Sequence, residues 1–486
     1  MSFPDLLPRM IECLSAQSDE TSFDRLTLIN PEGLAQRIKA EPELGIFAQR
    51  QGFTASSGLL YHPRLPEILV APYDPYSRAS WAAIAAKLAH HRAHRLDCDD
   101  ERIATACLLG FADHGYHSPC KPESDSSRSA HSPRLIIERT QAMDEAVIMA
   151  RAIGFVRDLI NMPANQLHPQ AMCDVAARIA KASQADLHIV SGEALLAEGY
   201  PLIHAVGRAS MTPPALIEIR WGNVGPSLAL IGKGVCFDSG GLDIKPAGAM
   251  QLMKKDMGGA AHALALAWMI MQARLPVRLH LLIPAVENAI SGNAMRPLDV
   301  LESRDGTSIE VGDTDAEGRL ILADAISRAC EDDPDSILDF ATLTGAARIA
   351  LGTEIPALFS NDDDLAADLL AQAERHDDPL WRMPLAGRYL RHLQSENADL
   401  SSTGNDRYGG ALIAALFLQH FVKSSCRWAH FDLMAWNLAA SPGRPKGGEA
   451  MGLLACFAWV KALVEKPQNH ASKPCLKTMN EARDHG

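Results

Sequence analysis

The chain alternates short apolar runs with longer segments of helical periodicity, and this alternation restricts the folds open to it. We expect strands at 277–284 and 337–341, and helices at 258–270 and 320–330. Strands and helices that alternate along a chain pack as a shared sheet with helices on its faces. The sequence therefore predicts an α/β/α arrangement around a central mixed, largely parallel sheet.

A smaller α/β unit is predicted ahead of this region. Residues 67–71 read as a strand and 81–89 as a helix, and the Ser- and Pro-rich stretch 118–133 has the composition of a linker. We expect an N-terminal α/β domain at 1–130 with the linker at its end, a connecting helix within 131–157, and a C-terminal domain at 158–486.

Composition bounds the class of protein. The 486 residues are 47% hydrophobic, enough for two domains with cores of their own, and the net charge of -13 makes a nucleic-acid partner unlikely. The N-terminus lacks the long apolar stretch of a signal peptide, and no uncharged apolar run is long enough to cross a membrane. The ten cysteines include no Cys-x-x-Cys pair, as expected of free thiols. We expect a cytoplasmic protein without a membrane partner.

The run 313–320, Asp-Thr-Asp-Ala-Glu-Gly-Arg-Leu, carries the strongest chemical signal. It sets Asp315, Glu317 and Arg319 at alternating positions of one short turn. Carboxylates gathered in this way repel one another and are costly to desolvate unless a cation lies among them. The run therefore predicts a metal site.

Further charged residues follow the apolar run 227–231, which is expected as a buried strand. Glycines after this strand allow tight turns, and ligands bind at strand ends in open α/β sheets. We therefore expect the cleft at these strand ends to hold Asp315, Glu317 and Arg319 together with Lys233, Asp238, Lys245 and Asp256.

These motifs resemble those of the leucine aminopeptidases (cytosol aminopeptidases), a family of two-metal exopeptidases. The run 313–320 matches seven of the eight positions of the family signature Asn-Thr-Asp-Ala-Glu-Gly-Arg-Leu, and the upstream charged residues fall at the family's intervals. The resemblance extends from about Arg157 to Trp459 and includes 157–165, 290–292, 296–297, 341–346 and 407–410. It implies a zinc-exopeptidase-like fold for the C-terminal domain.

The resemblance also implies roles for the charged residues. Two divalent metal ions per subunit are expected, bridged by Asp238 and Glu317, with Lys233 and Asp256 completing one site and Asp315 the other. Carboxylates without histidine suit zinc, manganese or magnesium, and the lysine nitrogen favours zinc or manganese. Lys233 must be neutral to bind a metal, which requires a pKa lowered by the metal and by burial.

The remaining roles also follow from the resemblance. Lys245 is expected to polarise the scissile carbonyl, and Arg319 to hold a bicarbonate ion that acts as general base. Leu343 lies in the segment whose backbone lines that site, while Met253 and Thr342 are expected in the pocket for the substrate's first side chain. The family further implies a homo-hexamer acting on peptides with a free N-terminus.

Two other functional classes remain open. A metal-dependent phosphoesterase also uses carboxylates with Lys and Arg. A non-catalytic scaffold is the other, because some relatives also act as DNA-binding regulatory proteins, although this chain keeps all five metal ligands. Substrate preference stays open as well, since the segment after Asp432, from Leu433 to Lys446, departs from the family pattern.

Two further features receive a structural interpretation. His90 and His94 have the spacing of a zinc pair on an expected helix, but no third ligand accompanies them. Asp313 stands where the family has Asn, and we expect it to form the same turn hydrogen bonds while facing solvent.

Overall fold

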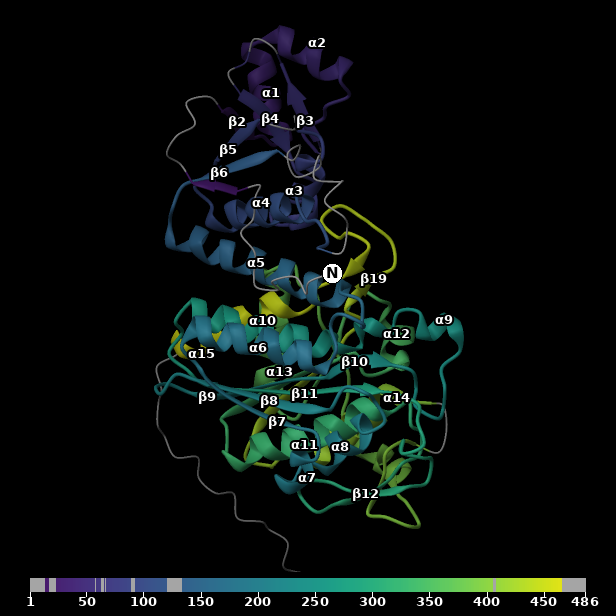
Figure 1. The fold of residues 1–486 in the computed structure, drawn as a ribbon. Helices are drawn as coiled ribbons and strands as arrows, with labels where there is room; N and C mark the ends of the chain where they lie inside the picture. Colours follow the sequence, from purple (N-terminus) through teal and green to yellow (C-terminus); the bar gives the residue numbers. More distant parts are fainter. Residues whose placement is uncertain are drawn as a thin grey trace, which may run out of the picture.

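The computed structural model describes residues 14–16, 23–56, 58–62, 65, 67–88, 92–119, 133–404 and 408–465. Its two main sheets lie in the upper and lower halves of Figure 1, with long helices between them. No helix in this described part is long and apolar enough to cross a bilayer.

Six strands form the first sheet, in the order β1-β6-β5-β2-β4-β3. They are β1 (Leu14–Ala16), β2 (Asp24–Leu28), β3 (Gly58–Tyr61), β4 (Glu67–Ala71), β5 (Ala93–Asp97) and β6 (Arg134–Ile137). One face packs on α1 (Pro31–Ala40) and α2 (Pro42–Arg50), and the other on α3 (Arg78–Ala85) and α4 (Glu101–His114). On β4, the Leu69 side chain joins the core shared with α1 and α2, and the Val70 side chain joins the core shared with α3 and α4, as the alternation of side chains along a strand requires.

Nine strands form the second sheet, in the order β16-β15-β18-β14-β9-β11-β8-β7, with β10 also pairing with β11. They are β7 (Asp186–Ser191), β8 (Ala215–Trp221), β9 (Ser227–Gly232), β10 (Gly234–Asp238), β11 (Arg278–Asn288), β14 (Ser336–Ala341), β15 (Ala357–Ser360), β16 (Trp381–Arg382) and β18 (Arg427–Asp432). The central strands β11, β9, β14 and β18 pair in parallel, whereas the pairings β7–β8, β8–β11 and β15–β18 are antiparallel. The predicted mixed, largely parallel sheet is confirmed.

Helices cover both faces of this second sheet (Figure 1). One face packs on α5 (Gln141–Asn161), α6 (Pro169–Ser183), α10 (Gly258–Gln272), α13 (Asp363–Arg375) and α15 (Leu453–Glu465). The other packs on α7 (Ala194–Ala197), α8 (Pro201–Gly207), α11 (Glu317–Glu331) and α14 (Gly410–His420). Along β9, Leu228 and Leu230 pack in the core on the α10 face, whereas Ala229 and Ile231 pack in the core on the α11 face. The apolar run 227–231 is therefore buried on both faces.

Smaller elements complete the C-terminal part. A three-stranded sheet joins β12 (Val300–Glu302), β13 (Ser308–Glu310) and β17 (Leu400–Ser401), and a two-stranded one joins β19 (Trp436–Asn437) and β20 (Gly447–Gly448). Short helices are α9 (Ala247–Met250), η3 (Met253–Met257), α12 (Gly345–Leu351) and η4 (Gly387–Leu393).

The helix α5 connects the two halves. It packs on α4 on one side and on α10 on the other, and one hydrophobic core runs from Leu26 of β2 to Leu228 of β9. The predicted domain boundaries at 130 and 157 remain predictions. β6 lies inside the range that we assigned to the connecting helix, and α5 continues past residue 157 to Asn161.

Two local expectations in the first half are changed. The helix expected at 81–89 begins at Arg78 and ends at Ala85. The expected helix around the His90–His94 pair is wrong for His94, which lies in β5 with its Nδ1 3.8 Å from Asp24 Oδ2. His90 and most of the predicted linker 118–133 lie outside the described residues.

We predict that Gly110→Ala destabilises the protein by about 1–3 kcal/mol, because α3 and α4 approach too closely for a side chain at this position. A Cβ on Gly110 would lie 2.5 Å from Trp81 Cβ and 2.6 Å from Arg78 O. Gly154→Ala in α5 is the matched control, since nothing lies within 4 Å of its Cβ position. That change should stabilise by about 0.5–1 kcal/mol. Denaturant unfolding measures both, and equal effects would contradict the packing argument.

Candidate metal centre and active site

The site forms at the edge of the second sheet where its central strands end. Lys233 follows β9, Asp238 is the last residue of β10, and Thr342 follows β14. The 3-10 helix η3 brings Asp256 to the same edge, and α11 begins at Glu317, two residues after Asp315. The carboxyl ends of neighbouring parallel strands meet at one edge, which explains why residues far apart in the sequence converge there.

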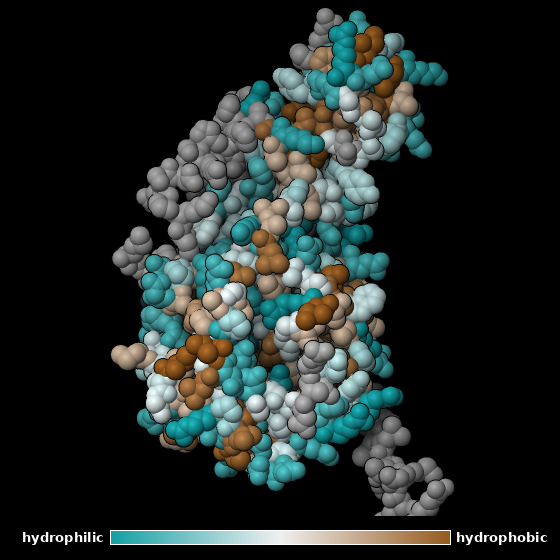
Figure 2. All heavy atoms as spheres, turned by 90° about the vertical axis from the view of Figure 1, so that its right-hand side faces the viewer, coloured by the Kyte–Doolittle hydropathy of each residue, from teal (hydrophilic) through white to brown (hydrophobic). Residues whose placement is uncertain are grey.

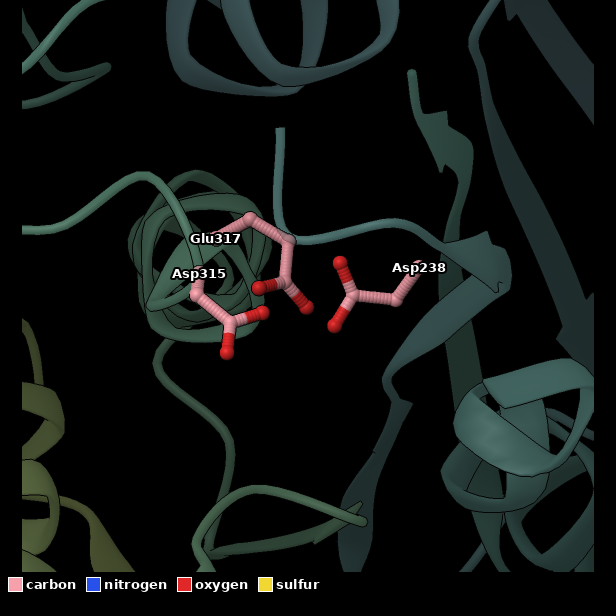
Figure 3. Close-up of side chains that lie close together, drawn as sticks. All are labelled: Asp238, Asp315 and Glu317. Carbon is pink, nitrogen blue, oxygen red and sulfur yellow. The ribbon is translucent and has the colours of Figure 1, made fainter. Parts of the chain in front are cut away.

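Three carboxylates converge most closely. Asp238, Asp315 and Glu317 can each offer one oxygen so that all three lie within 4.8 Å of one another. Figure 3 shows Asp238 reaching from the strand side toward Asp315 and Glu317 at the start of the helix. This arrangement is what the spacing of the run 313–320 predicts.

Two lysines lie among the carboxylates. Lys233 Nζ is 2.8 Å from Asp256 Oδ2 and 2.9 Å from Glu317 Oε1. Lys245 Nζ is 2.8 Å from Asp238 Oδ2 and also contacts Asp315 Oδ1. Four carboxylates thus face two ammonium groups, so the cluster carries an excess of negative charge when all six groups are ionised.

The pKa values of the acids reflect this imbalance. Burial raises the pKa of Glu317 well above its usual range, and the charge of Asp238 adds to the effect. Burial and Asp238 likewise raise the pKa of Asp315 to about 6, despite the nearby Lys245. The pKa of Asp256 falls to about 2, because Lys233 and Lys255 outweigh the effect of burial. Repulsion of this kind is relieved by a bound cation.

Lys233 is buried among carboxylates. Burial lowers its pKa, but the charges of Asp256, Glu317 and Asp238 outweigh burial, and the net shift is upward. The neutral amine that metal binding needs would therefore require bound metal ions in addition to burial. The lysine also explains Gly318, since a Cβ there would lie 2.4 Å from Lys233 Cε.

Among the residues that the structure describes, several buried atoms of the cluster make no hydrogen bond. Both oxygens of Glu317, Asp256 Oδ2 and Asp315 Oδ1 are in this state, although lysine nitrogens approach three of them at ion-pair distance. Buried polar atoms without partners are rare and need an explanation. A donor set of carboxylate oxygens and one lysine nitrogen fits divalent metal ions such as zinc or manganese.

The neighbouring predicted residues lie at the same edge. Arg319 Nη1 donates to Ser402 O at 2.6 Å, its buried Nε makes no hydrogen bond to any described residue, and burial lowers the pKa of its guanidinium to about 10. Thr342 Oγ1 donates to Asp256 Oδ1 at 2.6 Å. The backbone N–H of Leu343 donates to Asp432 Oδ1 at 3.1 Å, which leaves its carbonyl and side chain for other contacts. Met253, at the start of η3, is half-buried.

Asp313 makes the turn hydrogen bonds expected of it. Its Oδ1 accepts from the backbone N–H of Asp315 at 2.8 Å, and its carbonyl accepts from Ala316 N at 3.1 Å. Its side chain is half-buried rather than fully exposed, and burial raises its pKa.

Sequence reasoning missed two residues that hold the site together. Asn288 Nδ2 donates to Asp238 Oδ1 at 2.9 Å and to Thr314 O at 3.0 Å, linking two of the ligand segments. Asp432 accepts from Leu343 N, Thr344 N and Thr344 Oγ1, which fixes the loop after β14. Both are polar residues that end an apolar strand, the same signal that identified Asp238.

Comparisons with known proteins agree with this geometry. A family model described as "Cytosol aminopeptidase family, catalytic domain" matches residues 154–456. A probable cytosol aminopeptidase of Syntrophotalea carbinolica is 41% identical over 317 residues, which are 64% of this chain and 63% of that relative's length.

Solved structures share the fold. A cytosol aminopeptidase from Coxiella burnetii superposes with a TM-score of 0.86 at 42% identity, over 93% of this chain and 99% of that one. The bottromycin maturation enzyme BotP, solved in complex with Mn, gives a TM-score of 0.81 at 32% identity, over 91% of this chain and all of that one. The chain therefore belongs to the cytosol aminopeptidase family and carries that family's catalytic domain.

Proposed function

We propose that the protein is a metal-dependent aminopeptidase that removes N-terminal residues from peptides with the help of two metal ions. The observation that carries the proposal is the buried cluster of Asp238, Asp256, Asp315 and Glu317, in which two lysines leave an excess of negative charge and Glu317 Oε2 has no hydrogen bond from any described residue. Family membership favours this activity over the phosphoesterase, which uses similar residue types.

We assign the metal ligands by the family pattern. Asp238 and Glu317 would bridge two ions, Lys233 and Asp256 would complete one site, and Asp315 the other. The bound ions would be zinc or manganese, and the solved complex of BotP with Mn supports a divalent ion at a related centre. When bound, such ions lower the pKa of a water molecule and can hold the free amino group of a peptide.

Lys245 would stabilise the developing negative charge. Attack of water on the scissile carbonyl carbon turns the carbonyl oxygen into an oxyanion, and the carbon–nitrogen bond then breaks as the leaving amine takes up a proton. The carboxylates of Asp238 and Asp315 outweigh the effect of burial on Lys245 and raise its pKa, so that it remains an ammonium group at neutral pH. A fixed cation of this kind favours the charged transition state over the neutral substrate.

Arg319 would hold a bicarbonate ion as general base. Its guanidinium is fixed by the carbonyl of Ser402, and its buried Nε lacks a hydrogen-bond acceptor. An anion bound there, beside Leu343, would satisfy this donor and accept a proton from water. Met253 and Thr342 would line the pocket for the first side chain of the peptide.

A homo-hexamer and a cytoplasmic location belong to the same proposal and rest on the family resemblance. Several large apolar side chains are exposed on the C-terminal part, including Ile349 at 90% and Leu298 at 67%. Figure 2 shows apolar patches on the face that carries α9, α12 and β12 in Figure 1. Light scattering at the monomer mass would contradict the hexamer.

Metal removal gives the first test of the activity. Chelated protein should not cleave aminoacyl amides or dipeptides, and added Zn or Mn should restore cleavage, because all five proposed ligands are present. N-acetylated versions of the same peptides should resist cleavage, since an acetylated amine cannot bind a metal. Full activity of metal-free protein, or equal rates on blocked and free peptides, would refute the proposal.

Glu317→Gln should lose both metal ions and activity, because it removes a bridging charge from the centre of the cluster. Asp313→Asn is the matched control, since the amide oxygen can keep the turn hydrogen bond to Asp315 N. Its metal affinity should stay within a few-fold. Metal content after dialysis, measured beside turnover, compares the two variants, and a large loss of metal in Asp313→Asn would make that carboxylate a ligand.

Lys245→Ala and Arg319→Ala should retain the metals but lose turnover. Removing one preorganised electrostatic group typically costs about 100-fold to 1,000-fold in rate. Arg319→Ala should be the milder change, because buffer anions can replace part of the bound bicarbonate's role. If the Lys245 variant loses its metals together with its activity, the lysine is structural and this division of roles is wrong.

A further inference from the structure

Residues 433–449, here called the wall segment, start near Thr342 and the helix η3 and end at the helix α5. The segment follows β18, and Leu433 N donates to Ala341 O at the end of β14. Ala435 lies against the start of α10, since a Cβ on Gly258 would be 2.6 Å from Ala435 Cβ and 3.2 Å from Thr342 Cγ2. The wall segment therefore begins beside Thr342, one of the proposed pocket residues.

Trp436 brings the wall segment to the other proposed pocket residue. Its ring is 8% exposed, and Lys254 Nζ lies 5.5 Å from the ring centroid. Lys254 directly follows Met253 in η3, and its Nζ donates to Asn161 O at 2.5 Å. Asn161 Oδ1 in turn accepts from Gly448 N of the wall segment at 2.8 Å. The segment thus contacts Lys254 of η3 directly through Trp436 and indirectly through Asn161.

A buried charge cluster fixes the far end of the wall segment. Glu449 is fully buried and accepts three hydrogen bonds of 2.9–3.1 Å from the guanidinium of Arg157 in α5. Arg157 also donates to Asp113 Oδ1 of α4 at 2.7 Å and to Gly443 O at 2.9 Å. Asn437 Nδ2 donates to Glu449 Oε2 at 2.6 Å. Buried ion pairs are a costly way to gain stability, and their best-supported use is to specify one geometry.

This geometry separates the wall segment from the metal cluster. None of its residues contributes to the carboxylate set of Asp238, Asp315 and Glu317, and Glu449 is bound on the side of α4 and α5. A loss of the Arg157–Glu449 contacts would therefore act on the wall and, through Asn161 and Trp436, on Lys254 in η3, whereas the proposed ligand Asp256 stays held by Thr342 Oγ1 and Lys233 Nζ.

We propose that the wall segment closes the pocket for the first side chain of the peptide. In this proposal Glu449 is a positioning residue that fixes the wall segment through its hydrogen bonds with Arg157. Through Asp113 and Arg157, the helices α4 and α5 then contribute to substrate selection. The substrate part of this inference rests on the proposed aminopeptidase function, whereas the positioning of the wall does not.

The kinetic test compares phenylalanyl and alanyl amides as a ratio of kcat/KM. Trp436→Ala widens the proposed pocket and should raise this ratio about 10-fold, mostly through KM, as expected for changes of side-chain volume in an apolar pocket. Glu449→Gln should shift the ratio in the same direction by a smaller factor and keep the metal content.

Asp324→Asn is the control for a merely structural effect. Asp324 is equally buried and accepts backbone N–H groups from Leu202, Ile203 and Arg304 on the opposite face of the sheet. The Asp324→Asn variant should be less stable but should keep the ratio of kcat/KM for phenylalanyl and alanyl amides unchanged. If Trp436→Ala and Glu449→Gln lower both rates equally, as a general loss of folded protein would, the inference is wrong.

Amide hydrogen exchange tests the positioning without any activity. Glu449→Gln should speed exchange in the wall segment and also at residues 253–255, because Trp436 and Asn161 both contact Lys254, whereas Asp324→Asn should leave both unchanged. Faster exchange confined to 437–449 would overturn the coupling. If the wild-type protein cleaves no amide at all, the proposed function fails, and the exchange comparison still decides whether Glu449 positions the wall.

Discussion

Electrostatic repulsion among four clustered carboxylates is the constraint on which the site depends. Asp238, Asp256, Asp315 and Glu317 come from three different segments of the chain, meet at one edge of the sheet, and form ion pairs with Lys233 and Lys245. Such a cluster is costly unless cations compensate it, and the raised pKa of Glu317 and Asp315 expresses that cost. Lysines that reach into the cluster compensate part of this charge, and we propose that bound metal ions compensate the rest.

The sheet makes this concentration of charge possible. Its central strands are buried on both faces by apolar side chains, so their positions are fixed by packing rather than by the charged groups at their ends. The charged residues lie at the end of β10, in η3, in the turn before α11 and in its first turn. The N-terminal half packs against the C-terminal half through α5, which contacts both α4 and α10. Arg157 of this helix also binds Glu449 of the wall segment.

Local sequence patterns predicted the central strands and helices well. Features that depend on residues distant in the sequence could not be predicted from such patterns. The strand β9 and the helices α10 and α11 were predictable because their apolar residues repeat at the period of the element, and the spacing within the run 313–320 was enough to identify Asp315 and Glu317. The helix expected around His94 was wrong, because that residue pairs in β5 between strands from distant parts of the chain. The charge state of Lys233 depends on Asp256, and the roles of Asn288 and Glu449 depend on Asp238 and Arg157. These partners lie 23 to 292 residues away along the sequence, so no local pattern reveals them.

The most direct test of the metal centre is anomalous diffraction from crystals grown with Mn. The two-metal account predicts two anomalous peaks among Lys233, Asp238, Asp256, Asp315 and Glu317, with Lys233 bound to a metal through a neutral nitrogen. A single peak, or no peak with both lysines still paired to the carboxylates, would contradict it.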